Sequence, residues 1–179
     1  KLDSHEATAN NVNASESYAR GAWDEVVGFS RKTLIGNADD MNAYQNLART
    51  YLAIGQTQIA RLVCEQALEI DPRNAAIHNT LGLVWIKLRN VRKAIRSFAR
   101  AVQSSPTMVE ARLNYGAVAL NYSDFGKSSE HFGAALSMES ENIDAALGNA
   151  VSERGLAQYD KAEAGYTAVL KARPNSVNA

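Results

Sequence analysis

The fold is decided by two adjacent stretches, MNAYQNLARTYLAIGQTQIARLVCEQALEIDPRN at residues 41–74 and AAIHNTLGLVWIKLRNVRKAIRSFARAVQSSPTM at residues 75–108. Set beneath each other without a gap, they bring small residues onto small residues and proline onto proline. The three prolines of the chain, Pro72, Pro106 and Pro174, are separated by 34 and 68 residues, so all of them fall on one 34-residue period. A fixed period of this length indicates a repeat protein.

The period continues on both sides of these stretches, so the whole chain divides into repeats. The register gives five units: 7–40, 41–74, 75–108, 109–142 and 143–176. Apolar residues recur at helical spacing within a unit, so we expect each unit to form two helices of about 14 residues joined by a short turn. One helical hairpin cannot bury its apolar face alone, and the hairpins must therefore stack. The expected fold class is all-α, with residues 1–179 forming a single domain.

Two columns of the repeat have a clear packing role. Small residues share one column, which contains Ala60, Ala94, Ser128 and Ala162. The other column contains Cys64, Phe98, Phe132 and Tyr166. We expect the small column to let two helices cross closely, and the second column to fill the wider gap between neighbouring units. Cys64 is then a small buried apolar residue rather than a reactive thiol.

The pattern of residues in these repeats resembles that of the tetratricopeptide repeat (TPR) family. In the second unit the family's pattern falls on Tyr44, Leu47, Ala48, Tyr51, Gly55, Ala60, Ala67 and Pro72. In the third unit it falls on His78, Leu81, Gly82, Trp85, Ala94, Phe98, Ala101 and Pro106. The first unit matches only loosely. The resemblance implies an α-solenoid of five stacked helix-turn-helix units in a right-handed superhelix, with the first helix of each unit on the concave face.

The composition excludes several classes of function. The 19 basic and 19 acidic residues give a net charge of zero, which argues against a chain-wide surface for nucleic acid or membrane. No apolar run is long enough to span a bilayer. The single cysteine excludes an internal disulfide framework, and the histidines His5, His78 and His131 form no metal-binding pair. We therefore expect no metal, no cofactor and no catalytic residue.

The resemblance implies a peptide-binding groove on the concave face. Its lining would be Asn42, Gln45, Asn46, Arg49, Asn79, Thr80, Leu83, Lys87, Leu113, Asn114, Asn121, Leu147 and Arg154. Side-chain amides both donate and accept hydrogen bonds, so a row of them can hold an extended backbone without requiring one sequence. The leucines would then receive apolar side chains of the ligand.

A basic run between Lys87 and Arg100 contains six basic residues and no acidic one. Three of its arginines, Arg92, Arg96 and Arg100, recur at every fourth position and should form a ridge on the convex side. The ridge could dock an acidic partner or a lipid headgroup. The alternative is a solvated helix face whose charge is balanced by Glu65 and Glu69 on the neighbouring helix.

The two ends of the sequence carry weaker expectations. Residues 1–20 are polar and could cap a solenoid, and the absence of a starting methionine suggests a trimmed chain. Tyr166, Val169 and Leu170 would lack a covering helix, which favours self-association through the C-terminal face. The compartment, cytoplasm or periplasm, is not indicated.

The sequence thus favours a non-enzymatic protein-protein interaction module. It would act as a scaffold or adaptor in complex assembly that binds an extended peptide or a partner helix. Three alternatives stay open at this point. They are the substrate-recognition arm of a larger enzyme, an accessory lipoprotein for bacterial envelope or motility machinery, and a self-assembling coat.

Overall fold

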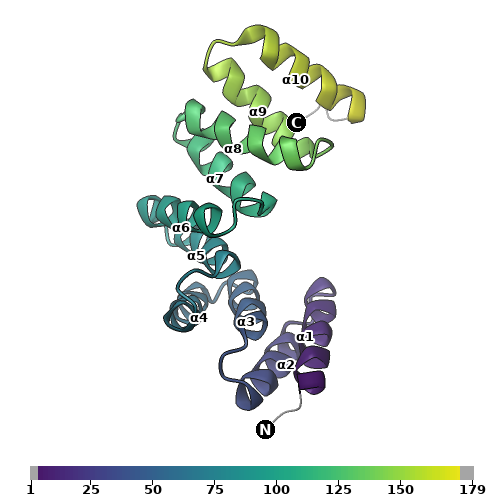
Figure 1. The fold of residues 1–179 in the computed structure, drawn as a ribbon, viewed down its shortest axis with the longest axis vertical. Helices are drawn as coiled ribbons and strands as arrows, with labels where there is room; N and C mark the ends of the chain where they lie inside the picture. Colours follow the sequence, from purple (N-terminus) through teal and green to yellow (C-terminus); the bar gives the residue numbers. More distant parts are fainter. Residues whose placement is uncertain (1–3, 174–179) are drawn as a thin grey trace. The chain divides into compact units, whose positions relative to one another are not determined.

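The computed structural model describes residues 4–173, which form ten α-helices and no strand. The helices are α1 (Ser4–Ala19), α2 (Trp23–Gly36), α3 (Met41–Ala53), α4 (Thr57–Ile70), α5 (Ala75–Lys87), α6 (Val91–Ser104), α7 (Val109–Asn121), α8 (Phe125–Met138), α9 (Ile143–Gly155) and α10 (Tyr159–Ala172). One pair of helices falls in each predicted repeat, except that α1 begins three residues before the first repeat, and the all-α prediction and the paired helices are confirmed (Figure 1). Pro174 and the end of the last repeat lie outside the described residues.

The chain divides into two compact units, Lys1–Ser104 with α1 to α6 and Ser105–Ala179 with α7 to α10. Within each unit the two helices of a repeat pack against each other, and first helices of successive repeats are also in contact: α1 with α3, α3 with α5, and α7 with α9. The first helices therefore form a wall of their own inside each unit. The expectation of one continuous solenoid stays a prediction.

The turns between paired helices obey the same period. Gly21, Gly55, Arg89, Ser123 and Ala157 all have a positive φ, between 57° and 81°. The first helices of three repeats begin at side-chain caps on the period, Asp40, Asn74 and Asn142, each accepting a hydrogen bond from the third N–H that follows. The turn residues with positive φ therefore recur every 34 residues.

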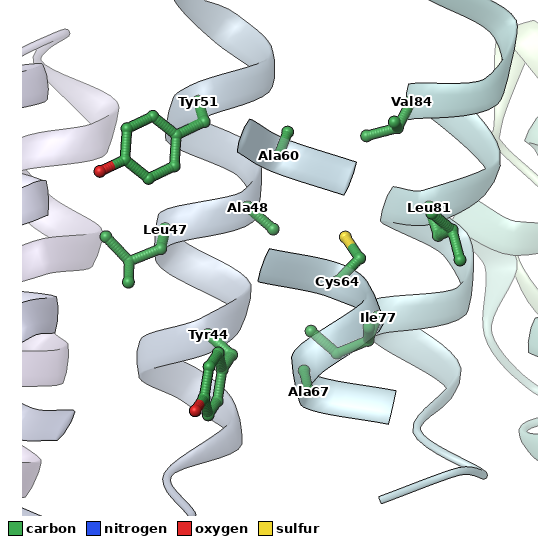
Figure 2. Close-up of a cluster of buried hydrophobic side chains, with 10 residues drawn as sticks. All are labelled: Tyr44, Leu47, Ala48, Tyr51, Ala60, Cys64, Ala67, Ile77, Leu81 and Val84. Carbon is green, nitrogen blue, oxygen red and sulfur yellow. The ribbon is translucent and has the colours of Figure 1, made fainter. Parts of the chain in front are cut away.

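The core of the first unit lies between α3, α4 and α5 (Figure 2). It contains Tyr44, Leu47, Ala48, Tyr51, Ala60, Cys64, Ala67, Ile77, Leu81 and Val84. The small residues of α4 stand between the two first helices, as expected for a column that permits close crossing. Cys64 is fully buried, and burial raises the pKa of its thiol to about 12, which confirms its packing role.

The second unit has an apolar core that includes Phe132, Ala135 and Ala145. Ser128, which replaces alanine in the small column, is fully buried there. Its hydroxyl lies 2.7 Å from the hydroxyl of Ser152 and donates to the Gly116 carbonyl at 3.1 Å. A serine is therefore tolerated at this crossing because its polar atom has partners.

The first hairpin, α1 with α2, forms despite its weak match to the repeat pattern. Its interior is partly polar, because Asn10, Ser17, Ser30 and Thr33 are buried beside Val26. The hydroxyls of Ser30 and Thr33 have no hydrogen-bond partner in the described structure. Unpartnered buried hydroxyls weaken packing, so we expect this hairpin to be the least stable part of the first unit.

Candidate peptide-binding groove on the first helices

A groove of about 570 Å³ lies between the first helices α1 and α3. Its lining is Thr8, Asn11, Val12, Ser15, Glu16, Asp40, Asn42, Gln45, Asn46 and Arg49. We call it the α1–α3 groove. Most of the side chains in it are polar, and Val12, which is 52% exposed, supplies an apolar site.

The structure brings together four of the predicted groove residues, Asn42, Gln45, Asn46 and Arg49. The opposite wall, from α1, was not predicted, because its polar sequence was interpreted as a cap. The repeat register contains the missing signal. Thr8, Asn11, Val12 and Ser15 each lie 34 residues before one of the four predicted residues. Both walls of the groove are therefore built from the same repeat positions.

Contacts across the groove hold its side chains in place. The Asn11 amide donates to both carboxylate oxygens of Asp40, at 3.1 and 3.2 Å, and Asp40 in turn caps α3. The Arg49 guanidinium lies 4.5 Å from the centre of the Tyr18 ring, in a cation–π contact between α3 and α1. These contacts order the groove before any ligand arrives.

Two predicted groove residues on α5 are buried instead, which corrects the expectation for them. Asn79 and Thr80 are each 1% exposed. The hydroxyl of Thr80 lies within hydrogen-bond distance of the Gln45 amide nitrogen and oxygen, at 3.1 and 3.4 Å, so it ties α3 to α5. Because these two helices pack directly against each other, polar side chains at this depth bond within the protein.

The other predicted residues of the first unit remain near the surface. Leu83 is half-buried and Lys87 is exposed. The ridge residues Arg92, Arg96 and Arg100 are all exposed on α6, on the side away from buried Phe98.

The predicted residues of the second unit lie on α7 and α9. Leu113 packs against the apolar core, and Asn114 is half-buried and has a partner. Asn121 and Arg154 are exposed, and Leu147 is 44% exposed. At the C-terminal face, Val169 is buried and Leu170 is 44% exposed. Self-association through that face stays a prediction.

Two of the histidines, His78 and His131, are buried and make contacts within the protein. His78 is 3% exposed, and its Nε2 donates to the Pro72 carbonyl at 3.0 Å. Arg112, one period later, donates in the same way to the Pro106 carbonyl at 2.7 Å. His131 stacks on Tyr115 with ring centres 4.1 Å apart.

Within residues 4–173, no helix has the length and apolar character needed to cross a membrane.

Burial makes His131 a source of pH-dependent stability. Desolvation is the largest effect and lowers its pKa below 6.5, Glu130 opposes it, and Arg112 and Lys127 add to it. The unfolded chain therefore binds more protons than the folded one just below pH 6.5, and the unfolding free energy falls as the pH drops. Burial also lowers the pKa of His78, so the two act together.

The variant His131→Phe keeps an aromatic ring against Tyr115 but cannot bind a proton there. We predict that its unfolding free energy falls less than that of the wild type when the pH is lowered from about 7 to about 5.5. Urea denaturation at the two pH values measures this difference. An unchanged pH dependence in the variant would contradict the assignment.

Comparison with known proteins agrees with this geometry. Residues 46–109 match the family model of the tetratricopeptide repeat. The peroxisomal targeting signal receptor of Eremothecium gossypii is 33% identical over 84 residues, which is 46% of this chain and 15% of the receptor. The type IV pilus assembly protein PilF of Pseudomonas aeruginosa is 32% identical over 85 residues, or 48% of this chain and 34% of PilF. The matched region is thus a small part of these relatives.

Solved structures show the same fold. The structure of Pseudomonas aeruginosa PilF superposes with a TM-score of 0.84 at 20% identity, over 94% of this chain and 77% of PilF. YrrB, a TPR protein with an unusual peptide-binding site, gives a TM-score of 0.70 at 21% identity, over 91% of this chain and 84% of YrrB. The family model, the 34-residue period and the paired helices lead to one conclusion: residues 46–109 consist of tetratricopeptide repeats, and the described residues on either side continue the same 34-residue pattern of paired helices.

Proposed function

We propose that the chain is a non-enzymatic interaction module that binds an extended peptide of a partner protein in the α1–α3 groove. TPR domains are protein-interaction scaffolds, and this makes a protein or peptide the expected ligand class. One observation carries the proposal. Residues of α1 and α3 that occupy equivalent positions of the repeat line the two walls of one open, mostly polar groove.

The chemistry of the groove fits a peptide backbone. The amides of Asn42 and Gln45 can each donate and accept, which matches the alternating N–H and C=O groups of an extended chain. Val12 offers contact to one apolar side chain, and Arg49 offers a fixed positive charge. Because Arg49 is already stacked on Tyr18, the ligand would lose little free energy in ordering it.

The test begins with a displayed library of random peptides selected on the protein, followed by affinity measurement of an enriched peptide. Removing one amide and one charge, in the double variant Asn42→Ala with Arg49→Ala, should weaken binding at least about tenfold, since each lost hydrogen bond contributes about 0.5–1.5 kcal/mol and bonds to charged groups more. The matched control is Gln66→Ala with Lys171→Ala, which removes an amide and a charge at exposed positions outside the groove. Equal weakening in both double variants, or no enriched peptide, would contradict the groove assignment.

A second candidate function comes from PilF, which resembles the chain in sequence and superposes on most of it. We propose, as this alternative, an accessory role in assembling a bacterial envelope or motility machine such as the type IV pilus. A chimera in which the chain replaces the matched residues of PilF tests it in Pseudomonas aeruginosa cells lacking PilF. Restored surface pili would support the role, and a stably expressed chimera without pili would argue against it. The recognition arm of a larger enzyme also stays a proposal, with no specific observation in its favour.

A further inference from the structure

A second, strongly polar pocket of about 480 Å³ lies at the end of the α5–α6 hairpin, away from the α1–α3 groove. It is formed by the turn before α5, the start of α5 and the last turn of α6. Its lining is Pro72, Arg73, His78, Arg100, Gln103 and Ser104. We call it the Arg73–Arg100 pocket. None of the proposed groove residues contributes to it.

The pocket holds two positive charges, and the nearby Asp71 carboxylate accepts hydrogen bonds from the Arg73 backbone N–H and the Asn74 amide rather than forming an ion pair with either arginine. Arg73 comes from the turn and Arg100 from α6, and no ion pair of the described residues includes either guanidinium. Beyond Asp71 the sequence is basic, because residues 72–109 contain seven basic residues and no acidic one. Two like charges at one pocket raise its electrostatic potential, and a bound anion would relieve their repulsion.

The pocket continues into the arginine ridge of α6. Arg92, Arg96 and Arg100 follow each other at one-turn spacing and are exposed, so Arg100 belongs to both features. Within the described residues, neither Glu65 nor Glu69 forms an ion pair with the ridge. The Glu65 carboxylate accepts two hydrogen bonds from Arg61 on its own helix, at 2.7 and 2.6 Å.

We propose that the Arg73–Arg100 pocket and the arginine ridge bind an extended acidic segment of a partner protein. One carboxylate enters the pocket between Arg73 and Arg100, and further carboxylates lie against Arg96 and Arg92. The planar guanidinium suits this role, because it can donate two parallel hydrogen bonds to one carboxylate. The Gln103 amide and the Ser104 hydroxyl are additional donors at the pocket.

Spacing points to an extended peptide with acidic residues at alternate positions. Residues four apart on a helix are separated by about 6 Å along its axis. Alternate residues of an extended chain lie about 6.6 Å apart and face the same side. The two repeats are close enough for successive carboxylates to meet successive arginines.

The surroundings disfavour other anionic macromolecules. No large apolar side chain of α5, of α6 or of the turn at residues 71–74 is exposed, although Ile70 at the end of α4 is 40% exposed, so the pocket and the ridge themselves offer no apolar anchor for insertion into lipid. The Trp85 ring is covered by the Lys93 ammonium, 4.2 Å from its centre, and is therefore not a free platform for stacking bases. A protein segment is the occupant that remains.

The test uses a fluorescein-labelled peptide of alternating glutamate and serine and measures its affinity by anisotropy. The variant Arg73→Gln with Arg100→Gln should weaken binding at least about tenfold. The control Lys127→Gln with Lys171→Gln makes the same change in net charge at exposed positions of the second unit, and should weaken binding less than about twofold. The groove variant Asn42→Ala with Arg49→Ala should bind the acidic peptide nearly as well as the control, which separates this proposal from the groove.

A second measurement does not depend on the variants. In the wild type, the ring signals of His78 should shift when the same peptide is titrated, because His78 lines the pocket. Silent His78 signals, or equal weakening in the two glutamine variants, would overturn the proposal. So would tighter binding of phosphatidylserine vesicles or of a single-stranded oligonucleotide through the same two arginines.

Discussion

Phe98→Ala should lower the unfolding free energy by about 3–5 kcal/mol, the largest single effect that we expect. Phe98 is fully buried on α6, and its ring fills the space that Gly82 leaves on α5. Removing the ring leaves a cavity that the two helices cannot close without losing other contacts. Urea denaturation followed by circular dichroism measures the loss.

The same contact can be tested from its other side. A Cβ added at Gly82 would come closer than 3.0 Å to the Phe98 ring, so Gly82→Ala should also destabilise the protein. A smaller side chain at position 98 makes room for that methyl group. The double variant Gly82→Ala with Phe98→Leu should therefore lose less unfolding free energy than the single variants Gly82→Ala and Phe98→Leu lose together. Strict additivity would show that the two residues do not share one space.

In the second unit, Gly148→Ala should lower the unfolding free energy by about 1–3 kcal/mol. A Cβ at Gly148 would come closer than 3.0 Å to the ring of Phe132, which is 5% exposed and central to that core. The ring cannot move away freely, because Gly116 faces it from α7, where an added Cβ would lie 3.1 Å from it. Thermal and urea unfolding both report this change.

Two other glycines serve as controls for this prediction. Gly116→Ala should cost less than Gly148→Ala, because its contact with the ring is longer. Gly28→Ala on α2 should raise the unfolding free energy by about 0.5–1 kcal/mol, since its added Cβ would meet no atom within 4 Å and alanine favours the helix. A Gly148→Ala variant at least as stable as the wild type would contradict the packing described here.

The packing of the helices could be predicted from the sequence because it repeats. The alanine column and the phenylalanine column each imply one geometry, and Ala94 and Phe98 are both fully buried as expected. The caps of the later first helices were not predicted. Asp40, Asn74 and Asn142 share a column, but the column is broken by Met108, which makes no capping bond.

The candidate site was only partly predictable, for a physical reason. Helical spacing gives the face on which a residue lies but not how deeply the neighbouring helix covers it. Asn42 and Asn79 both fit a groove-lining position, yet Asn42 is exposed and Asn79 is buried where α3 packs on α5. On α1, polarity suggested a cap, although the 34-residue register places Thr8 and Asn11 opposite the predicted wall.

The left-handed turns have a consequence for how this chain can be engineered. Of the five turn residues with positive φ, Arg89, Ser123 and Ala157 carry a Cβ and hold their conformation at a cost of about 1–2 kcal/mol relative to glycine. In a linear array, each hairpin interacts only with its neighbours, so relief at one turn acts mainly on its own repeat. Replacing Arg89, Ser123 or Ala157 by glycine, one at a time, should therefore stabilise one chosen repeat. The order in which the hairpins melt could then be set by the choice of position.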